Sequence, residues 1–280
     1  MSDLLKLVPG SRCIVQRNVA PMLAEPRRDS EMVSQVLYWE YLKVLDTQAG
    51  FVHVQGPDGY QGWVPRKAVV PDPGRVPWKT RKYVADALLV PVYAPPGCEQ
   101  ETVLTMGTLV RVQPKHRRLD REVRCIVHPD GRPALIFSDD LKRYEKPLLP
   151  ADPEAICYLA RAFVGVPYLW GGRTSFGMDC SGFTQRVYAL AGLTIPRDAY
   201  QQASWPAFAH VRRSDLQLGD LMFFAGKDDP RGRGITHVAL CLGMPWFIHS
   251  AGEIGVTVAS WREERWARER FSHGGRYRGT

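Results

Sequence analysis

The stretch MDCSGFTQRVYALAG, residues 178–192, predicts an amphipathic helix that begins beside a cysteine. Asp179 suits the N-cap, apolar residues at 183, 187 and 190 share one helical face, and Gly192 suits the C-terminal end. Cys180 then lies in the first turn, where unpaired N–H groups and the helix dipole stabilise a thiolate and lower the thiol pKa. We therefore expect a nucleophile at Cys180; the alternative is a small thiol buried beneath the helix.

Two histidines lie further along the chain at the ends of short apolar runs. His237 begins HVALCLG and His249 ends PWFIHS, with a turn signal at Gly243 between them. Simple antiparallel pairing about that turn places residue 237 directly opposite residue 249. One ring could then take the proton of Cys180 while the other orients it, as in a catalytic triad.

Two other interpretations of these histidines remain open. They could be a chance pair on the surface, or they could bind zinc together with Cys180. The sequence offers no further ligand at a telling spacing. We therefore expect no metal site and no cofactor.

The rest of the C-terminal half predicts an α+β domain. Asp152 is a good N-cap for a helix with Pro153 at its first position, and Gly165 and Pro167 end that helix. After the helix of Cys180 the chain turns to strands, expected at residues 218–225, 235–242, 245–250 and 255–260. We read Gly219-Asp220 as a structural turn and the basic C-terminal segment as an amphipathic surface helix.

Residues 8–145 have short apolar runs between turn signals, which is typical of small β-barrels. The segment also repeats itself weakly: residues 20–45 resemble 89–112, and residues 52–69 resemble 124–141. Pro-Asp-Gly occurs at the same relative place in each copy, at 57–59 and 129–131. We interpret this as two diverged copies of one domain, with a coincidental likeness between β-rich segments as the alternative.

Composition adds limits on the class of protein. The chain has 280 residues and a formal net charge of +8, which fits an anionic partner but equally a solvated basic surface. Six dispersed cysteines without a C-x-x-C pair favour a reducing compartment. The N-terminus lacks the signature of a signal peptide, and no apolar run approaches the roughly 20 residues of a membrane span. We expect a cytoplasmic protein, although a mature form without its leader would look the same.

Several motifs together resemble the NlpC/P60 family of cysteine peptidases. They are, in order, Tyr-x-Trp-Gly-Gly, Asp-Cys-Ser-Gly-Phe, Pro-Arg, Gly-Asp-Leu-x-Phe-Phe, His-Val and a final His, running from Tyr168 to His249. The resemblance implies a papain-like α+β fold and hydrolysis of peptidoglycan stem peptides after γ-D-glutamate. It makes Cys180 the nucleophile, His237 the base and His249 the orienting residue.

The resemblance also assigns residues around the nucleophile. Tyr168 matches a tyrosine near the oxyanion, and Asp179 and Ser181 match substrate-binding positions, although both also suit helix capping. Arg197, with Gln202, belongs to a further matching motif. This chain has Ala199 where relatives often carry serine, which weakens any inference about that side of the pocket.

The first β-rich copy resembles a bacterial SH3 domain, because its last core strand reads Gly-Tyr-Gln-Gly-Trp-Val. The second copy lacks the Tyr/Trp strand, so its membership depends on the repeat alone. The predicted organisation is therefore an SH3 domain at 8–72, a diverged SH3-like domain at 76–146 and the peptidase domain at 148–280.

In similar SH3–peptidase chains the first SH3 domain closes the cleft and holds the amine of an N-terminal L-Ala. Tyr60 and Glu31, with Glu25 as a substitute, are the candidates here, since a carboxylate can pair with an ammonium. This implies a monomeric hydrolase of free murein peptides in cell-wall recycling, with no nucleic-acid or membrane partner. The alternatives are an exported hydrolase anchored to intact wall and a non-catalytic wall-binding module.

Overall fold

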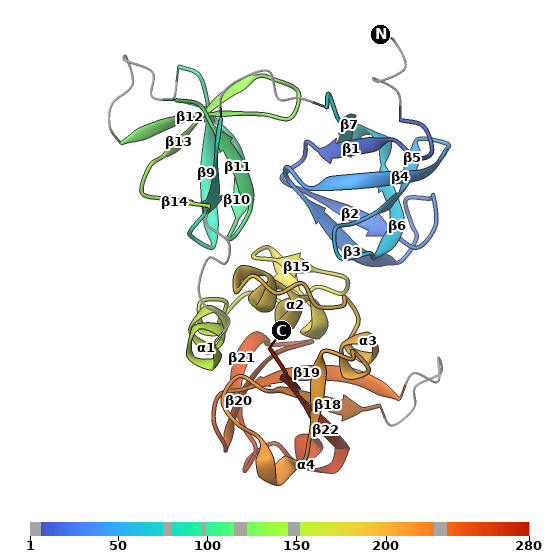
Figure 1. Ribbon diagram of the computed structural model, residues 1–280, viewed down its shortest axis with the longest axis vertical. Coiled ribbons are helices and arrows are strands. Elements are labelled where there is room, and N and C mark those ends of the chain that lie inside the picture. Colours follow the sequence, from blue (N-terminus) through green and yellow to red (C-terminus); the bar gives the residue numbers. More distant parts are fainter. Residues whose placement is uncertain are drawn as a thin grey trace. The chain divides into compact units, whose positions relative to one another are not determined.

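The computed structural model describes residues 7–74, 80–96, 99–114, 122–144, 152–226 and 234–279. The predicted domain boundaries at residues 76, 146 and 148 lie outside these ranges. The chain divides into two compact units, Met1–Glu145 and Lys146–Thr280, and Figure 1 shows the elements of each.

The first unit contains two seven-stranded antiparallel sheets. The first has the order β3-β2-β6-β5-β4-β1-β7, and its strands are β1 (Arg12–Val15), β2 (Val19–Leu23), β3 (Met32–Leu37), β4 (Tyr41–Gln48), β5 (Phe51–Gln55), β6 (Gln61–Pro65) and β7 (Val69–Pro71). The second has the order β10-β9-β13-β12-β11-β8-β14, and its strands are β8 (Arg81–Ala85), β9 (Leu89–Ala94), β10 (Glu99–Thr105), β11 (Leu109–Val112), β12 (Val123–Val127), β13 (Pro133–Phe137) and β14 (Leu141–Arg143). Strand for strand, the two orders are the same.

The two Pro-Asp-Gly segments make the same turn in each sheet. In the first, Asp58 Oδ1 accepts the N–H of Tyr60 at 3.1 Å; in the second, Asp130 Oδ1 accepts the N–H of Arg132 at 3.1 Å. The glycine that follows each aspartate has a positive φ, +82° at Gly59 and +94° at Gly131. Only glycine adopts this backbone without strain, which explains why both copies keep it.

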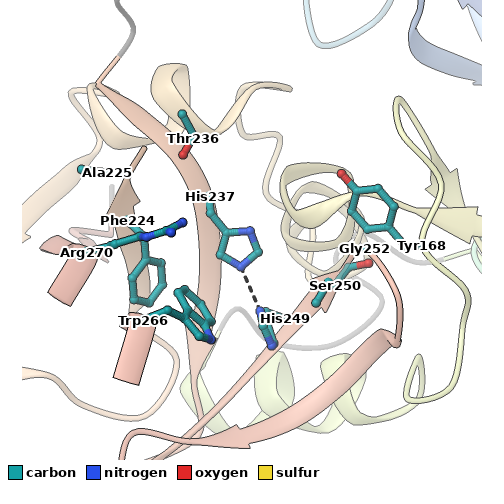
Figure 2. A pocket seen from close by; sticks show the side chains of 11 residues that line it. Tyr168, Phe224, Ala225, Thr236, His237, His249, Ser250, Gly252, Trp266 and Arg270 are labelled. Carbon is teal, nitrogen blue, oxygen red and sulfur yellow. Dashed lines mark hydrogen bonds between the residues drawn. The ribbon is translucent and has the colours of Figure 1, made fainter. Parts of the chain in front are cut away.

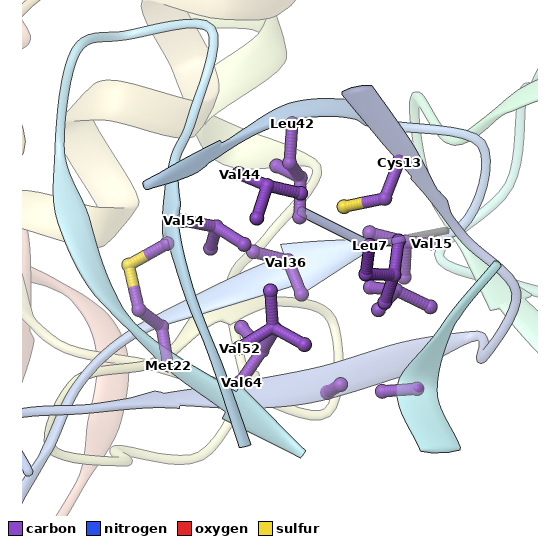
Figure 3. Close-up of a cluster of buried hydrophobic side chains, with 13 residues drawn as sticks. Leu7, Cys13, Val15, Met22, Val36, Leu42, Val44, Val52, Val54 and Val64 are labelled. Carbon is purple, nitrogen blue, oxygen red and sulfur yellow. The ribbon is translucent and has the colours of Figure 1, made fainter. Parts of the chain in front are cut away.

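Each sheet surrounds an apolar core. Valines from β3 to β6 fill the first core together with Leu42 and Met22, as Figure 3 shows. In the second cluster, Ile14 of β1 and Tyr38 and Trp39, which directly follow β3, pack among the side chains of the second sheet. Trp39 Nε1 also donates to the carbonyl of Val127 at 3.1 Å. Residues from both halves of this unit therefore share one buried apolar cluster.

The second unit is an α+β domain, as the sequence predicts. Its helices are α1 (Pro153–Arg161), α2 (Cys180–Leu190), α3 (Ala199–Ala203) and α4 (Arg265–Arg270). Its six-stranded sheet has the order β17-β22-β18-β19-β20-β21, with β17 (Phe208–Val211), β18 (Leu221–Ala225), β19 (Ile235–Cys241), β20 (Trp246–Ala251), β21 (Gly255–Ser260) and β22 (Phe271–Tyr277). A small hairpin, β15 (Arg173–Thr174) and β16 (Gly177–Met178), precedes α2. Helix α2 packs against β19 and β20.

The predicted helix caps are confirmed. Asp152 Oδ1 accepts the N–H of Ala155 at 2.7 Å, with Pro153 at the first helical position. Asp179 caps α2 in the same way, and Gly192 follows the helix with φ +86°. No helix in the described part of the chain is long and apolar enough to cross a membrane.

The prediction that the basic C-terminal segment is an amphipathic surface helix is correct for only part of that segment. The helical part is only α4, and Phe271–Tyr277 form β22, which lies between β17 and β18 in the sheet. Gly274 and Gly275 allow close packing within this strand: a Cβ on Gly275 would lie 2.9 Å from the Phe223 ring. The predicted structural role of Asp220 is confirmed, because Arg276 donates to both of its oxygens at 2.7 and 2.8 Å.

Candidate active site

A closed polar network surrounds the start of α2. Asp179 Oδ1 accepts the Gly182 N–H at 2.6 Å, and its Oδ2 accepts the Gly171 N–H at 2.9 Å. Arg197 donates to both oxygens, at 3.0 and 2.7 Å, and to Ser181 Oγ at 3.0 Å. Asp179, Ser181 and Arg197 are all buried. Three predicted substrate-binding residues are therefore brought together, and their mutual bonds hold the turn that carries Cys180.

Close backbone packing adds to this support. A Cβ on Gly182 would collide with the carbonyl oxygen of Gly172, so the preceding loop lies directly against the first turn of α2. Gln202 is fully buried and donates to the carbonyls of Ser181 and Pro196 at 3.1 and 2.9 Å. Gln202 is thus a structural link between α3 and α2.

The Cys180 thiol has a raised pKa, whereas its position at a helix N-terminus predicts a lowered one. Only 8% of the residue is exposed, and burial, followed by the charge of Asp179, raises the thiol pKa to about 12. The N–H groups of Val238 and Ser181 and the charge of Arg197 act in the opposite direction but do not prevail. The expected lowered pKa is therefore wrong for the free enzyme, because desolvation outweighs the helix terminus. The resting group is a neutral thiol.

Tyr168 lies near this thiol. A backbone bridge to Met178 holds it, and the carbonyl of Pro167 accepts the Met178 N–H at 3.1 Å. Burial, then the charges of Cys180 and Asp179, raise the pKa of the Tyr168 phenol. The phenol therefore keeps its proton and can donate a hydrogen bond, as the predicted role near an oxyanion requires.

The two histidines meet, but not in the predicted register. Leu240 lies opposite Ile248, so residue 239, not 237, would lie opposite residue 249. The turn is centred on Met244, one residue later than expected, because the Leu242 N–H donates to the carbonyl of Trp246 around residues 243–245. The error is two residues, which keeps both side chains on one face. His237 Nε2 and His249 Nδ1 are 2.9 Å apart and share a hydrogen bond (Figure 2).

Aromatic rings surround the histidine pair. The Trp266 ring stacks on His249 with centroids 5.5 Å apart and meets His237 edge-on at 5.4 Å. Phe224 and Phe247 pack against His237 and His249 respectively. Sequence reasoning missed Trp266, because the segment was taken for a surface helix. The sequence signal that could have indicated Trp266 was a tryptophan within an otherwise charged segment.

Burial keeps both rings neutral. It lowers the pKa of His249 to about 4, and burial with the charges of His249 and Arg270 lowers the pKa of His237 to about 3. If His237 donates its Nε2–H to His249 Nδ1, its Nδ1 is left as a free acceptor. Val238 directs its N–H at the Cys180 sulfur and follows His237 directly, so the thiol lies beside the strand that carries this base. The arrangement can perform nucleophilic catalysis with a neutral thiol and a neutral base.

A cavity of about 350 Å³ opens beside the histidines. Its wall is formed by Tyr168, Phe224, Ala225, Thr236, His237, His249, Ser250, Ala251, Gly252, Trp266 and Arg270. In Figure 2, Tyr168 and Ser250 lie on one side of His237, and Phe224 and Arg270 lie on the other. Reacting groups on a substrate could therefore extend in both directions from the base.

Tyr60 and Glu31, the two predicted amine-binding residues, belong to the first unit. Tyr60 is half-buried and packs against the core of the first sheet, whereas Glu31 is exposed. Within the described ranges, no group of three or more His, Cys, Asp or Glu residues is arranged to hold a metal ion.

Comparison with known families identifies two regions of the chain. The NlpC/P60 family matches residues 165–275, and the bacterial dipeptidyl-peptidase SH3 domain matches residues 22–69. The chain contains an NlpC/P60 domain. The prediction of a cysteine peptidase preceded by a bacterial SH3 domain is thereby confirmed.

Two curated relatives extend over most of the chain. Gamma-D-glutamyl-L-lysine dipeptidyl-peptidase of Bacillus cereus is 28% identical over 79% of this chain and 68% of its own length. Dipeptidyl-peptidase 6 of Lysinibacillus sphaericus is 26% identical over 90% of this chain and 92% of its own length. Both names describe peptidases that remove dipeptides.

The structural comparison supports the same fold. The crystal structure of an NlpC/P60 family protein from Bacillus cereus is similar with a TM-score of 0.82, covering 95% of this chain and 99% of the other. The two sequences are 23% identical, so this likeness concerns the fold alone.

Proposed function

We propose that this NlpC/P60 domain hydrolyses the bond between γ-D-glutamate and the diamino acid of peptidoglycan stem peptides. Cys180 is the nucleophile, His237 the general base and His249 the orienting residue. The observation that carries this proposal is the hydrogen bond between His237 on β19 and His249 on β20, beside the buried Cys180 at the capped start of α2. The names of the relatives support the choice of bond.

The reaction follows from the protonation states. Cys180 Sγ attacks the carbonyl carbon while its proton passes to His237 Nδ1, and the His237 imidazolium is held by the bond to His249. Tyr168 and the Cys180 N–H donate to the developing oxyanion. His237 then gives its proton to the departing amine, and the acyl group remains on sulfur as a thioester. Water, deprotonated by His237, attacks the thioester, releasing the carboxylic acid and restoring the thiol.

We further propose that the substrate has a free N-terminal L-Ala, whose ammonium is bound by Glu31 and Tyr60. Residues 22–69 match an SH3 type that is named after dipeptidyl-peptidases, and both candidate residues lie within that segment. An enzyme of this kind acts on free stem peptides, which fits cell-wall recycling by a monomer in the cytoplasm. The common strand order of the two sheets supports a second, diverged SH3-like domain within residues 76–146.

The test is a comparison of three substrates: L-Ala-γ-D-Glu-L-Lys, the same peptide acetylated on its amine, and intact sacculi. We expect release of L-Ala-D-Glu from the first substrate only, measured by chromatography and mass spectrometry. The Glu31→Gln variant should lose part of the preference for the free amine. Loss of the preference in Glu25→Gln instead would assign the ammonium to the substitute candidate. Equal cleavage of the acetylated peptide would exclude the amine-binding role, and rapid solubilisation of sacculi would favour an enzyme of intact wall.

A further inference from the structure

Arg270 is a positively charged residue that lines the candidate active site, and no anionic side chain in the described part of the chain pairs with it. It is the last residue of α4 and lines the cavity beside His237. In the described part of the chain it forms no ion pair, and its buried Nε atom meets no acceptor. The other arginines of α4 are engaged: Arg265 pairs with Glu269 at 2.6 Å, and Arg268 donates to the carbonyls of Trp261 and Arg262.

The position of Arg270 is unfavourable for the reaction unless an anion accompanies the substrate. Its charge is one of the causes that lower the pKa of His237, so it opposes the imidazolium that forms during catalysis. A bound carboxylate would neutralise that charge when the proton moves to His237. The guanidinium of half-buried Arg270, whose buried Nε–H meets no acceptor, is also well suited to pair with a carboxylate.

The side of the cavity on which Arg270 lies indicates which part of a substrate it meets. His237 protonates the departing amine, so the residue that carries this amine lies next to His237. Tyr168, which serves the acyl oxygen, lies on the opposite side of His237 from Arg270 (Figure 2). The part of the cavity walled by Phe224, Trp266 and Arg270 is therefore left for the leaving residue, with aromatic surfaces for its methylene chain.

We propose that Arg270 binds a carboxylate of the amino acid that follows the scissile bond, which makes it a specificity determinant for the leaving group. This inference rests on the proposed function, because it assumes that a diamino acid leaves from this side. The carboxylate has two possible sources. It is either the free C-terminus of a tripeptide or a second carboxylate on the side chain of the diamino acid.

Three peptides distinguish these sources: L-Ala-γ-D-Glu-L-Lys with a free C-terminus, its C-terminal amide, and a C-terminal amide whose diamino acid carries a side-chain carboxylate. For the wild-type enzyme we expect kcat/KM to fall by about ten- to a hundredfold from free acid to amide, the range of a charged hydrogen bond. Recovery with the third peptide identifies the side chain as a source, and no recovery identifies the C-terminus alone.

The variant Arg270→Gln should remove this preference by slowing the acids. The amide should not be slowed, because it has no carboxylate to pair with Arg270 and the variant no longer places a positive charge near the His237 imidazolium. Arg270→Lys should keep part of the preference, because it retains the charge without the planar fork. Arg265→Gln makes the same change in charge on the same helix and should retain wild-type discrimination. A preference for acid over amide that persists in Arg270→Gln overturns the proposal, as does a wild-type enzyme that does not discriminate.

A binding measurement separates this proposal from the proposed function. In Cys180→Ala protein, calorimetry should give weaker binding of the amide than of the free acid, and adding Arg270→Gln should abolish the difference. If wild-type enzyme cleaves none of these peptides, the proposed function fails. A difference in affinity that depends on Arg270 still supports the carboxylate site in that case, and equal affinities overturn it.

Discussion

The two sides of Cys180 differ in how their polar groups are satisfied. On one side, Asp179, Ser181 and Arg197 bond to one another and to the backbone in a closed network. On the other side, His237 and His249 bond to each other, pack against aromatic rings and border the cavity. The first arrangement fixes a position, whereas the second leaves one ring nitrogen available for a proton.

The difference also concerns charge. The Asp179–Arg197 pair is ionic and buried, so removing one partner leaves an uncompensated charge. The histidines avoid that cost because burial keeps them neutral. A charge develops on that side only during the reaction. Substitutions on the two sides should therefore affect different quantities: stability on the first and rate on the second.

The largest expected effect is on rate. His237→Ala should reduce kcat/KM by about 10²–10⁴-fold, because it removes the general base, while the unfolding midpoint changes little. The measurement is peptide cleavage together with thermal unfolding. His210→Ala is the control, since His210 is an exposed histidine on β17 that stacks on His273. Near wild-type activity in His237→Ala would show that His237 is not the general base.

The next effect is on stability. Asp179→Asn keeps the size of the side chain but leaves Arg197 buried without its counter-charge, which should cost about 3–5 kcal/mol. The free energy of unfolding, from urea titration of the purified chain, measures this loss. Arg265→Gln removes one partner of an exposed pair on α4 and should leave the titration unchanged. Equal stability of Asp179→Asn and wild type would show that the network does not hold the fold.

Sequence reasoning succeeded where local rules decide the structure. The caps of α1 and α2 depend on single residues close in sequence, and both were predicted correctly. The histidine pair was predicted from antiparallel pairing about a turn near Gly243. An error of two residues in that register leaves both side chains on the same face of the sheet.

Sequence reasoning failed where distant segments decide the outcome. The thiol pKa depends on burial of Cys180 against β19, which a helix terminus does not reveal. Trp266 reaches the histidines only because β22 returns the C-terminal segment into the sheet.

The smallest effect concerns pH. Because His237 and His249 have pKa values of about 3 and 4, the base is available well below the usual histidine value of 6.5. The acidic limb of kcat/KM should therefore lie below pH 5, and a midpoint near 6.5 would show that the rings are solvated. Stability has a separate dependence. Both histidines bind protons more weakly in the folded protein than in the unfolded chain. Their contribution to the free energy of unfolding is therefore fully present above pH 6.5 and falls as the pH is lowered towards 4.

Trp266→Leu sharpens the same prediction. Removing the stacked ring lets water reach His249, so the acidic limb should move upward by about one pH unit. Trp246→Leu, a change of the same kind at an exposed position on β20, should leave the limb in place. An unchanged limb in Trp266→Leu would show that other groups keep the histidines neutral.

The central claim is that Cys180 attacks the substrate with His237 as its base. The most direct measurement is the mass of the intact protein after acid quenching during turnover of L-Ala-γ-D-Glu-L-Lys, with peptide mapping of the modified residue. The account predicts an L-Ala-D-Glu acyl group on Cys180 in the wild type and neither adduct nor product release in Cys180→Ala. An acyl group on another residue, or undiminished cleavage by Cys180→Ala, would contradict it.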